Sequence, residues 1–436
     1  MLPAPFQNEA RQEKILMRIL FLTQWFTPEP FFKGLEYVKK LSHLGHVVFV
    51  LTAYPNYPNG KIYEGYKIRP FEEEEIEGIP ILRTAIYPSH NTSPWLRILN
   101  YLSFALSATL FGLFKIPKID IVYAYHPPAT ISLPGLVLKF FRRIPCVYEI
   151  QDLWPDTLRA TGIIKSHFLL KLCDLWCRFI YRFVDKIIVI SPGFKEKLIA
   201  RNVCPDKIEV IYNCCDEKNI YSRPRNKCLS DELKLTGKFN IMFAGNMGRA
   251  QSLSSVLDAA SLISKEYPQI QFVFIGGGVD VSLLKQYAKD RSLRNTLFLP
   301  GVSSYDIGDV LALADAMIVH LKDDPLFTIT IPGKIQAYMA AGKPIILGVR
   351  GDAADLMNMS KAGILCKPED PRDIARAVKE IYKMSPDMLD RMGKNAMQFY
   401  KNEFSADVGL KKLDAVFTSA ISARNFGSMY NGSENQ

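Results

Sequence analysis

Apolar and polar positions recur along this chain in one order: a short run of β-branched and aromatic residues, a turn, and then a stretch with helical spacing. Strands that alternate with helices in this way are typical of a parallel sheet with helices on both faces. The order restarts after the polar stretch 216–238, which contains Pro224 and shows no clear period. The pattern therefore predicts an α/β protein made of two similar units.

The expected strands are short apolar runs bounded by turn residues. In the first half they are Arg18–Thr23, Val47–Thr52, Ile79–Ile86, Ile119–Tyr125, Pro145–Ile150, Lys186–Ile190 and Val210–Tyr212. In the second half they are Asn240–Ala244, Gln271–Ile275, Thr296–Leu299, Ala316–His320 and Pro344–Gly348. Ligands of parallel sheets bind at the carboxyl ends of the strands, so we expect the functional residues there, in a cleft between the units.

The length of 436 residues favours two domains of about 200 residues each. We expect an N-terminal domain over 17–215, a linker over 216–238 and a C-terminal domain over 239–404. A last helix over 405–423 should pack back on the N-terminal domain, and the Asn/Ser/Gly-rich tail 424–436 should be disordered.

The formal net charge of +10 favours an anionic partner, such as a nucleotide or a membrane surface. Nucleic acid is disfavoured because no basic block with interleaved aromatic residues stands out. Residues 1–16 contain no apolar core of a secretory signal and are interpreted as a loose extension. The apolar stretch Ile98–Phe114 is rather short for a membrane span and contains Asn100. It is either a helix in a membrane interface or an ordinary buried helix.

The eight cysteines have irregular spacing and form no CxxC pair. Cys173 and Cys177 lie one helical turn apart, and the nearest histidine is His167. Buried free thiols in a reducing cytosol explain this pattern better than a metal site. The chain also lacks a D-x-D pair, a GxxxxGK[ST] loop and a GxSxG elbow.

A glycine-rich turn follows the first strand of the second half, in Gly245-Asn246-Met247-Gly248. Glycines at a strand-to-helix turn allow a phosphate to approach backbone N–H groups. Arg249 and Gln251 follow at the mouth of this turn. A second turn, Gly276-Gly277-Gly278, is either similar or merely a tight connection.

The segment Ile331–Pro344 carries the strongest chemical signal. Pro332 and Gly333 end a loop and begin a helix, and Lys334 lies in its first turn. The helix dipole already favours an anion at this end, and Lys334 adds a positive charge. The segment therefore predicts a diphosphate site, although a solvated lysine at a helix start is the alternative.

Polar residues also follow strands of the first half. His126 comes directly after one strand and could hydrogen-bond a sugar hydroxyl or relay a proton, or simply pack on the prolines beside it. Glu149 and Asp152 lie at the end of the next strand. Carboxylates there suit general-base work or hydroxyl recognition, although Asp152 could equally cap a turn.

The order of several rare strings resembles a known family. They include QWFTPEPFFKG from Gln24, PNYPNGKIY from Pro55, YHPPAT from Tyr125 and DLWPDT from Asp152, followed by the glycine turn and Pro332–Pro344. From about Met17 to Phe417 the chain resembles the retaining GT-B glycosyltransferases of family 4, in particular the WbuB-like (fucosamine-transferase-like) bacterial branch.

The resemblance implies two Rossmann-like domains, with the acceptor on the first and the nucleotide on the second. It implies sugar transfer with retention, no cofactor and no obligatory metal. His126 matches the family's cleft histidine, and it is the candidate catalytic residue together with Asp152. Lys33, Gly34 and Glu149 are the candidate residues of the acceptor side. The implied donor-binding residues are Gly245, Asn246, Gly248, Arg249, Gln251, Val302, Pro332, Gly333 and Lys334.

Two departures from the family pattern concern the donor. The family's two donor-segment glutamates, one toward the sugar and one toward the ribose, correspond to Ile329 and Ala337. The usual Arg and Lys of the phosphate loop are Asn246 and Gln251. Backbone groups and Lys334 are therefore expected to hold more of the donor than in the family at large.

The leading hypothesis is an enzyme of bacterial surface polysaccharide assembly at the cytoplasmic membrane face. It would move an N-acetylated amino or deoxy sugar from a UDP-type donor to a lipid-linked or saccharide acceptor. The basic charge suits peripheral contact with that membrane. The alternatives are a GT-B nucleotide-sugar epimerase, against which the apolar and basic surface argues, and an inactive nucleotide-sugar-binding protein, which the missing glutamates favour.

Overall fold

The computed structural model describes residues 16–31, 33–89, 94–160, 164 and 166–430. It divides into two compact units, one within 1–147 and 415–436 and the other within 148–414. Residues 1–15 of the expected extension and residues 431–436 of the expected tail lie outside the described part.

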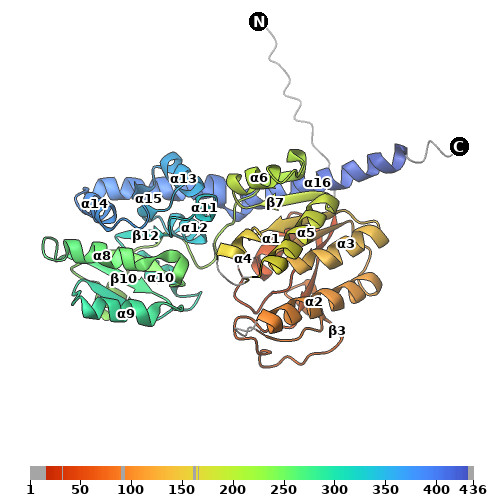
Figure 1. Ribbon diagram of the computed structural model, residues 1–436, viewed down its shortest axis with the longest axis horizontal. Coiled ribbons are helices and arrows are strands. Elements are labelled where there is room, and N and C mark those ends of the chain that lie inside the picture. Colours follow the sequence, from red (N-terminus) through yellow and green to blue (C-terminus); the bar gives the residue numbers. More distant parts are fainter. Residues whose placement is uncertain (1–15, 32, 90–93, 161–163, 165, 431–436) are drawn as a thin grey trace, which may run out of the picture. The chain divides into compact units, whose positions relative to one another are not determined.

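The first half of the chain contributes an eight-stranded sheet with the order β3-β4-β2-β1-β5-β6-β7-β8 (Figure 1). β1 pairs in parallel with β2 and β5, β2 pairs in parallel with β4, and β7 pairs in parallel with β8. This agrees with the predicted α/β architecture. The strands are β1 Arg18–Leu22, β2 Val47–Ala53, β3 Phe71–Ile76, β4 Ile79–Thr84, β5 Ile121–Tyr125, β6 Cys146–Ile150, β7 Lys186–Val189 and β8 Ile208–Val210.

β3 departs from the parallel pattern that the sequence predicted. It pairs antiparallel with β4, to which a tight turn with positive φ at Glu77 and Gly78 connects it. The sequence pattern does not predict this strand, because Glu72–Glu75 gives no apolar alternation. Charged side chains on an edge strand discourage pairing with another chain, so an acidic run is physically suited to this position.

The helices of the first half connect these strands. They are α1 Leu35–His43, α2 Pro94–Phe114, α3 Ser132–Phe141, α4 Asp156–Ala160, α5 His167–Phe183, α6 Pro192–Ile199 and α7 Lys227–Glu232. α7 lies within the stretch 216–238 that we expected to be a linker.

α2 has two different faces. Phe104 and Ala108 are buried on one face, where the Asn100 carboxamide oxygen accepts a hydrogen bond from Gln24 at 2.7 Å. Among the described residues, 95–114 is the one helical segment long and apolar enough to cross a membrane. The interpretation of this segment as an ordinary buried helix explains its buried face but not its exposed face. The other face exposes Trp95, Leu99, Leu102, Leu106, Leu110 and Phe114.

The second half contributes a six-stranded sheet with the order β11-β10-β9-β12-β13-β14. All of its neighbouring strands pair in parallel. The last strand, β14, is an edge strand of three residues that the sequence pattern did not reveal. The strands are β9 Phe239–Ala244, β10 Ile270–Ile275, β11 Thr296–Leu299, β12 Ala316–His320, β13 Ile345–Gly348 and β14 Gly363–Leu365.

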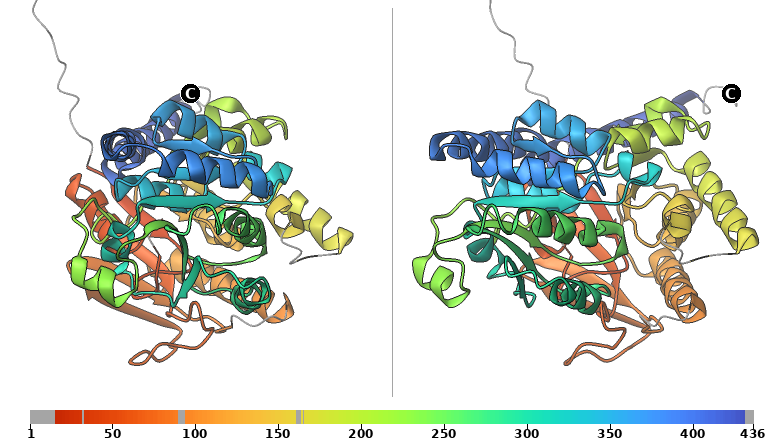
Figure 2. Two further views of the ribbon diagram at one scale, coloured as in Figure 1. Left: turned by 90° about the vertical axis from the view of Figure 1, so that its left-hand side faces the viewer. Right: turned by 60° about the vertical axis from the view of Figure 1, so that its left-hand side comes forward.

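Helices cover both faces of this sheet, as Figure 2 shows from two sides. α8, α9 and α14 pack in one core layer, and α10, α12, α13 and α15 pack in the other. Successive strand residues alternate between the layers, which is why these strands read as continuous apolar runs. The helices are α8 Leu253–Ile263, α9 Val281–Asp290, α10 Ile307–Ala312, α11 Pro325–Thr328, α12 Gly333–Ala340, α13 Asp352–Ser360, α14 Pro371–Tyr382 and α15 Pro386–Phe399.

The last helix, α16, runs over Ala406–Tyr430 and is longer than predicted. The part of the tail that we expected to be disordered from residue 424 is thus helical up to Tyr430. The part of α16 from Ala415 onward belongs to the first unit, where the Phe417 ring packs edge-on against Tyr123 at 5.5 Å between centroids.

Candidate functional site

Two glycine turns lie against each other at the carboxyl ends of β9 and β10. The Gly245 N–H donates to the Ile275 carbonyl at 2.8 Å, and the Met247 N–H donates to the Gly277 carbonyl at 2.7 Å. Gly276 has φ +132, and a Cβ there would lie 2.2 Å from the Gly245 carbonyl oxygen. Only glycine fits such an approach. The second turn therefore supports the first rather than acting as a simple connection.

α12 is fixed to the end of β9 by one buried side chain. The Tyr338 hydroxyl accepts from the Ala244 N–H at 2.9 Å and donates to the Ala244 carbonyl at 3.0 Å. Ile335 and Tyr338 point into the core, so the first turn of the helix is held next to Gly245. The sequence did not reveal this connection, because Tyr338 reads as an ordinary apolar-face residue of an amphipathic helix.

Lys334 lies over Gly245 as a result. A Cβ added to Gly245 would be 2.9 Å from the Lys334 Cε atom and 3.4 Å from its amine. The amine also lies 4.9 Å from the centre of the Phe243 ring. The turn and the lysine are about 90 residues apart in the chain, and the fold brings them together. That Gly245, Pro332, Gly333 and Lys334 bind the donor stays a prediction.

The site is electropositive. Burial lowers the pKa of Lys334 from its ordinary value to about 8, so the amine remains mostly protonated at neutral pH. Pro332 is the N-cap of α12, and a Cβ added to Gly333 would meet no atom within 4 Å, so this helix end is open. The N–H groups at the start of a helix and a neighbouring ammonium suit a phosphate group.

Gln251 closes the first glycine turn instead of standing free beside it. Its side-chain oxygen accepts from the Gly248 N–H at 2.9 Å. The amide nitrogen of Gln251 remains available as a donor. Asn246 and Arg249 are exposed at the same turn. The structure therefore brings these predicted donor-side residues together, with Gln251 acting mainly on the turn.

His320 stabilises this turn through its two ring nitrogens, and the sequence did not indicate it as a site residue. Its ring is buried, and Nε2 accepts from the Glu369 N–H at 2.9 Å. Nδ1 therefore carries the proton and donates to the Gln251 carbonyl at 2.7 Å. Burial lowers the pKa of His320, which keeps the ring neutral. The only sequence signal was its position at a strand end.

Val302 follows β11, and it is 39% exposed. The preceding residue, Gly301, lies against the second glycine turn, since a Cβ there would be 3.7 Å from the Gly276 Cα atom. This places the loop of Val302, one of the expected donor-binding residues, next to the supporting turn.

Two of the predicted residues of the first unit are buried. His126 follows β5, and burial lowers the pKa of its imidazole to about 3, so it is neutral at physiological pH. The Lys33 amine is 3.0 Å from the Tyr123 hydroxyl and about 5 Å from the Tyr37 and Tyr125 rings, at 5.0 and 5.2 Å. Gly34 is the N-cap of α1. Lys33 thus sits among aromatic rings rather than at an open surface.

Glu149 and Asp152 lie at the end of β6, in the second unit. Glu149 is buried, and its carboxylate accepts from the Gln151 amide, which also bonds Asn213. Asp152 is partly buried, and burial raises the pKa of its carboxyl group. Gln151 and Asn213 are positioning residues that the sequence did not indicate.

Glu29 is a buried carboxylate that sequence reasoning did not assign a role. It accepts from the N–H groups of Phe26, Asn56 and Tyr57 at 2.9, 2.8 and 2.7 Å. Burial raises the pKa of Glu29 to about 7, against the opposing effect of these three donors. The two rare strings around Trp25 and Tyr57 are therefore tied together by one side chain.

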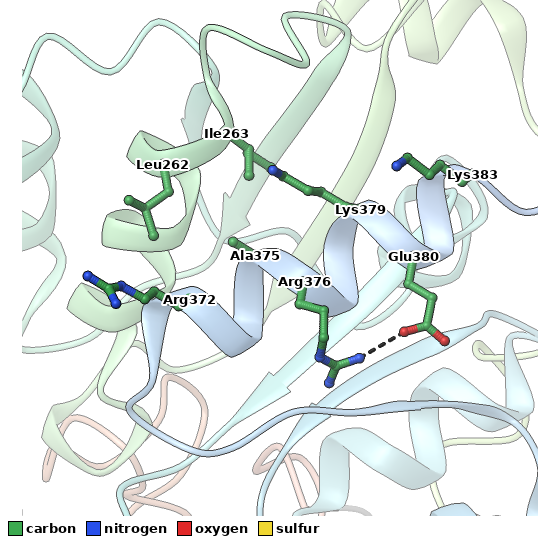
Figure 3. Close-up of a pocket in the computed structure, with 8 residues that line it drawn as sticks. All are labelled: Leu262, Ile263, Arg372, Ala375, Arg376, Lys379, Glu380 and Lys383. Carbon is green, nitrogen blue, oxygen red and sulfur yellow. Dashed lines mark hydrogen bonds and ion pairs between the residues drawn. The ribbon is translucent and has the colours of Figure 1, made fainter.

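A separate cavity of about 550 Å³ lies between α8 and α14 (Figure 3). Two of its four cations are in ion pairs, since Arg376 pairs with Glu380 at 2.8 Å and Lys379 pairs with Glu266 at 2.6 Å. No predicted site residue lines it. In the described part of the chain, no group of three or more His, Cys, Asp or Glu side chains is placed to hold a metal ion.

Comparison with known proteins shows the family to which this chain belongs. Residues 35–214 match the family model of glycosyl transferase 4-like domains, and residues 227–399 match that of glycosyl transferases group 1. The two models together account for most of the chain. The chain belongs to the GT-B glycosyltransferases of family 4, and it is a glycosyltransferase.

Among its relatives are two bacterial proteins. WbjE of Pseudomonas aeruginosa, named as a probable glycosyltransferase, is 25% identical over 70% of this chain and 75% of its own length. WcaI of Escherichia coli K12, named as a colanic acid biosynthesis glycosyl transferase, is 27% identical over 70% of this chain and 76% of its own length. The name of WcaI supports polysaccharide biosynthesis, and neither name identifies the WbuB-like branch.

The fold is confirmed by solved structures. HepE of Anabaena, crystallised with UDP and glucose, superimposes with a TM-score of 0.67 over 92% of this chain and 100% of its own, at 17% identity. At this identity the likeness shows the fold. The predicted GT-B architecture of two Rossmann-like domains is thereby confirmed.

Proposed function

We propose that this glycosyltransferase takes its sugar from a nucleoside diphosphate sugar of the UDP type. The observation that supports the proposal most strongly is the Lys334 amine lying over Gly245 at the open N-terminus of α12. A dianionic diphosphate would meet an ammonium group, a helix N-terminus and the backbone of a glycine turn at one place. HepE, which shares the fold, is described as a complex with UDP.

The same groups would also stabilise the leaving diphosphate during sugar transfer. When the glycosidic bond to the diphosphate breaks, negative charge grows on the leaving phosphate. Lys334 and the first-turn N–H groups of α12 are fixed in place before the reaction, so they stabilise this charge without reorganisation. This arrangement supports a mechanism that needs no metal ion, and we propose transfer with retention, in which the leaving phosphate assists the attack of the acceptor hydroxyl on the same face.

The first-half residues would serve the sugar and the acceptor. A neutral His126 can donate or accept one hydrogen bond with a sugar hydroxyl but carries no charge for the phosphate. The raised pKa of Asp152 suits a carboxyl group that exchanges a proton or recognises a hydroxyl. Lys33, Gly34 and Glu149 would shape the acceptor side from within, because Lys33 packs among aromatic rings, Gly34 caps α1 and Glu149 holds the Gln151 side chain.

We further propose that the acceptor is lipid-linked or a saccharide of a bacterial surface polysaccharide, reached by peripheral contact with the cytoplasmic membrane. The name of the relative WcaI supports the pathway, and the exposed apolar face of α2 supports the contact. A helix with one face in the core and an apolar face outside can lie in an interface without crossing it.

The substitution of the family's two glutamates favours one alternative, a protein that binds a nucleotide sugar without transferring it. Ile329 now contributes its carbonyl to a hydrogen bond from the Ser191 hydroxyl at 2.6 Å, and Ala337 packs against the core. Neither position contacts a donor through a polar side chain. Sugar transfer then requires that the backbone groups and Lys334 hold the donor without the two glutamates.

A donor panel separates these readings. Purified protein would be incubated with nucleotide sugars, with and without lipid-linked acceptor, and nucleotide release and glycolipid product would be measured. We expect release that depends on acceptor and a product whose anomeric configuration matches the donor. Donor binding without nucleotide release in any combination would indicate a nucleotide-sugar-binding protein without transferase activity. A changed donor sugar in the absence of acceptor would indicate an epimerase.

A further inference from the structure

α5 exposes a row of large apolar side chains on the second unit. Phe168, Leu172, Leu175 and Phe179 are 75, 55, 56 and 43% exposed. Their spacing of four, three and four residues puts them on one face of the helix. Exposed apolar residues are common singly, but a continuous row of this size marks a surface that contacts something else.

This row is not needed to hold α5 in the fold. The opposite face of the helix buries Leu170, Cys177, Ile180 and Tyr181. Ser166 caps the N-terminus by accepting from the Leu169 N–H at 3.5 Å. The helix is thus anchored by its other face, and the apolar row is exposed without a structural reason within the described part of the chain.

Cations follow one edge of the row. By helical spacing, Lys171 lies beside Phe168 and Leu175, and Arg178 and Arg182 lie three residues after Leu175 and Phe179. All three cations are exposed. An apolar face bordered by basic side chains is the composition of helices that lie in the surface of an anionic membrane.

The same edge opens into a basic pocket of about 510 Å³ between α4, α5 and α6. Five cations line it against two carboxylates, Asp156 and Asp174. Asp156 pairs with Arg201, and Asp174 pairs with Arg178 at 2.7 Å, so the pocket keeps a net positive charge. The cations are Arg159, Lys171, Arg178, Lys197 and Arg201.

We propose that this α5 surface, the apolar row with its basic edge and pocket, docks onto an anionic lipid bilayer. The apolar row enters the boundary between headgroups and acyl chains, and the cations bind lipid phosphates. Charge complementarity favours this occupant over a second copy of the chain, because two copies would bring two basic edges and two basic pockets toward each other.

The inference extends the membrane contact of the proposed function to a second helix, and it can fail independently. Vesicle binding needs neither donor nor transfer. A chain that transfers sugar and binds vesicles through α2 but not through α5 would contradict this inference alone. A chain that binds vesicles through α5 but transfers nothing would contradict the proposed function alone.

The test is co-flotation of the full chain with vesicles of phosphatidylcholine, with or without about 30% phosphatidylglycerol. We expect binding to the anionic vesicles that weakens with salt. The double variant Leu172→Glu, Leu175→Glu should lower the partition coefficient at least tenfold. Lys171→Gln and Arg178→Gln should each lower it about fivefold, as expected for one interfacial cation.

Matched controls make the result specific. Leu283→Glu changes a leucine of α9 that is 67% exposed and should leave vesicle binding unchanged. An unchanged melting temperature and nucleotide affinity would show that the α5 variants are folded. The proposal is overturned if the double variant binds vesicles as the unchanged chain does, including the case in which only Leu106→Glu on α2 abolishes binding. It is also overturned if the double variant instead abolishes a dimer.

Discussion

The hydroxyl of Tyr338 holds both backbone groups of Ala244, accepting from its N–H and donating to its carbonyl. This pair joins α12 to the last residue of β9, one position before Gly245. The distance between the Lys334 amine and the glycine turn is therefore set by a side chain that itself faces away from solvent.

Tyr338→Phe tests whether this pair builds the site. The change keeps the ring but leaves the Ala244 groups without the hydroxyl, so we expect a loss of about 1–3 kcal/mol in the free energy of unfolding. We also expect weaker UDP binding, because α12 is no longer fixed to the turn. Calorimetry of unfolding and of UDP binding measures both effects.

Tyr305→Phe is the matched control, because Tyr305 lies in the same unit and its side chain is 73% exposed. It should change neither quantity. Undiminished UDP affinity in Tyr338→Phe would show that the position of α12 does not depend on this hydroxyl.

Lys334→Met should separate binding from stability. Losing a charge-assisted bond to a phosphate should weaken UDP binding by about 1–3 kcal/mol. The free protein should become more stable at neutral pH, by up to about 3 kcal/mol, because a buried charge whose pKa is depressed to about 8 is removed. A variant that gains stability and loses ligand is typical of a binding residue.

Lys343→Met provides the comparison. Burial also lowers the pKa of Lys343 to about 8, but its amine donates to the carbonyls of Ala312 and Ala314 at 2.7 and 2.9 Å. This variant loses two hydrogen bonds, so we expect no gain in stability and an unchanged UDP affinity. If the two variants behaved alike, Lys334 would have no special role.

The pH dependence of UDP binding follows from the same amine. The folded pKa of Lys334 is below the ordinary lysine value, so the free protein loses this proton near pH 8. A bound phosphate favours the protonated amine, and UDP affinity should therefore be level below pH 8 and fall as the pH rises above it. The stability of the free protein should rise over the same range, since the unfolded chain keeps the proton longer.

Titration calorimetry between pH 6.5 and 10 measures the affinity profile. In Lys334→Met the profile above pH 8 should be nearly flat. The same decline in both proteins would assign the titration to another group.

Two adjacent glycines allow a matched test of the supporting turn. Gly276→Ala places a Cβ 2.2 Å from the Gly245 carbonyl oxygen at φ +132, so it should displace the first turn and reduce both stability and UDP affinity. Gly277→Ala meets nothing within 4 Å and should be tolerated. Thermal unfolding and UDP titration compare the pair, and equal behaviour would mean that the two turns are not in close contact.

Local patterns of apolar and polar residues predicted most of the strands and helices. Apolar runs such as those of β9 and β12 predicted strands because both faces of the sheet are covered. The acidic run of β3 hid a strand, because what matters on an edge is solubility and not apolar alternation. β14, with three residues, is too short to show a pattern at all.

The candidate site was predictable only in part. Gly245 and Lys334 could be identified because a strand-to-helix glycine turn and a Pro-Gly-Lys helix start have local signatures. Tyr338, His320 and Glu29 could not, since their roles depend on backbone groups that are distant in the sequence. Lys33 reads as a surface cation, and its aromatic surroundings arise from β5 and α1 only after folding.

The most direct test of the account is a crystal structure of the chain with UDP. We predict the diphosphate at the N-terminus of α12, within hydrogen-bonding distance of the Gly333 N–H and the Lys334 amine, with the Gly245 turn beside it. A diphosphate bound elsewhere, for example in the basic cavity between α8 and α14, with the Lys334 amine left without a phosphate, would contradict the central claim.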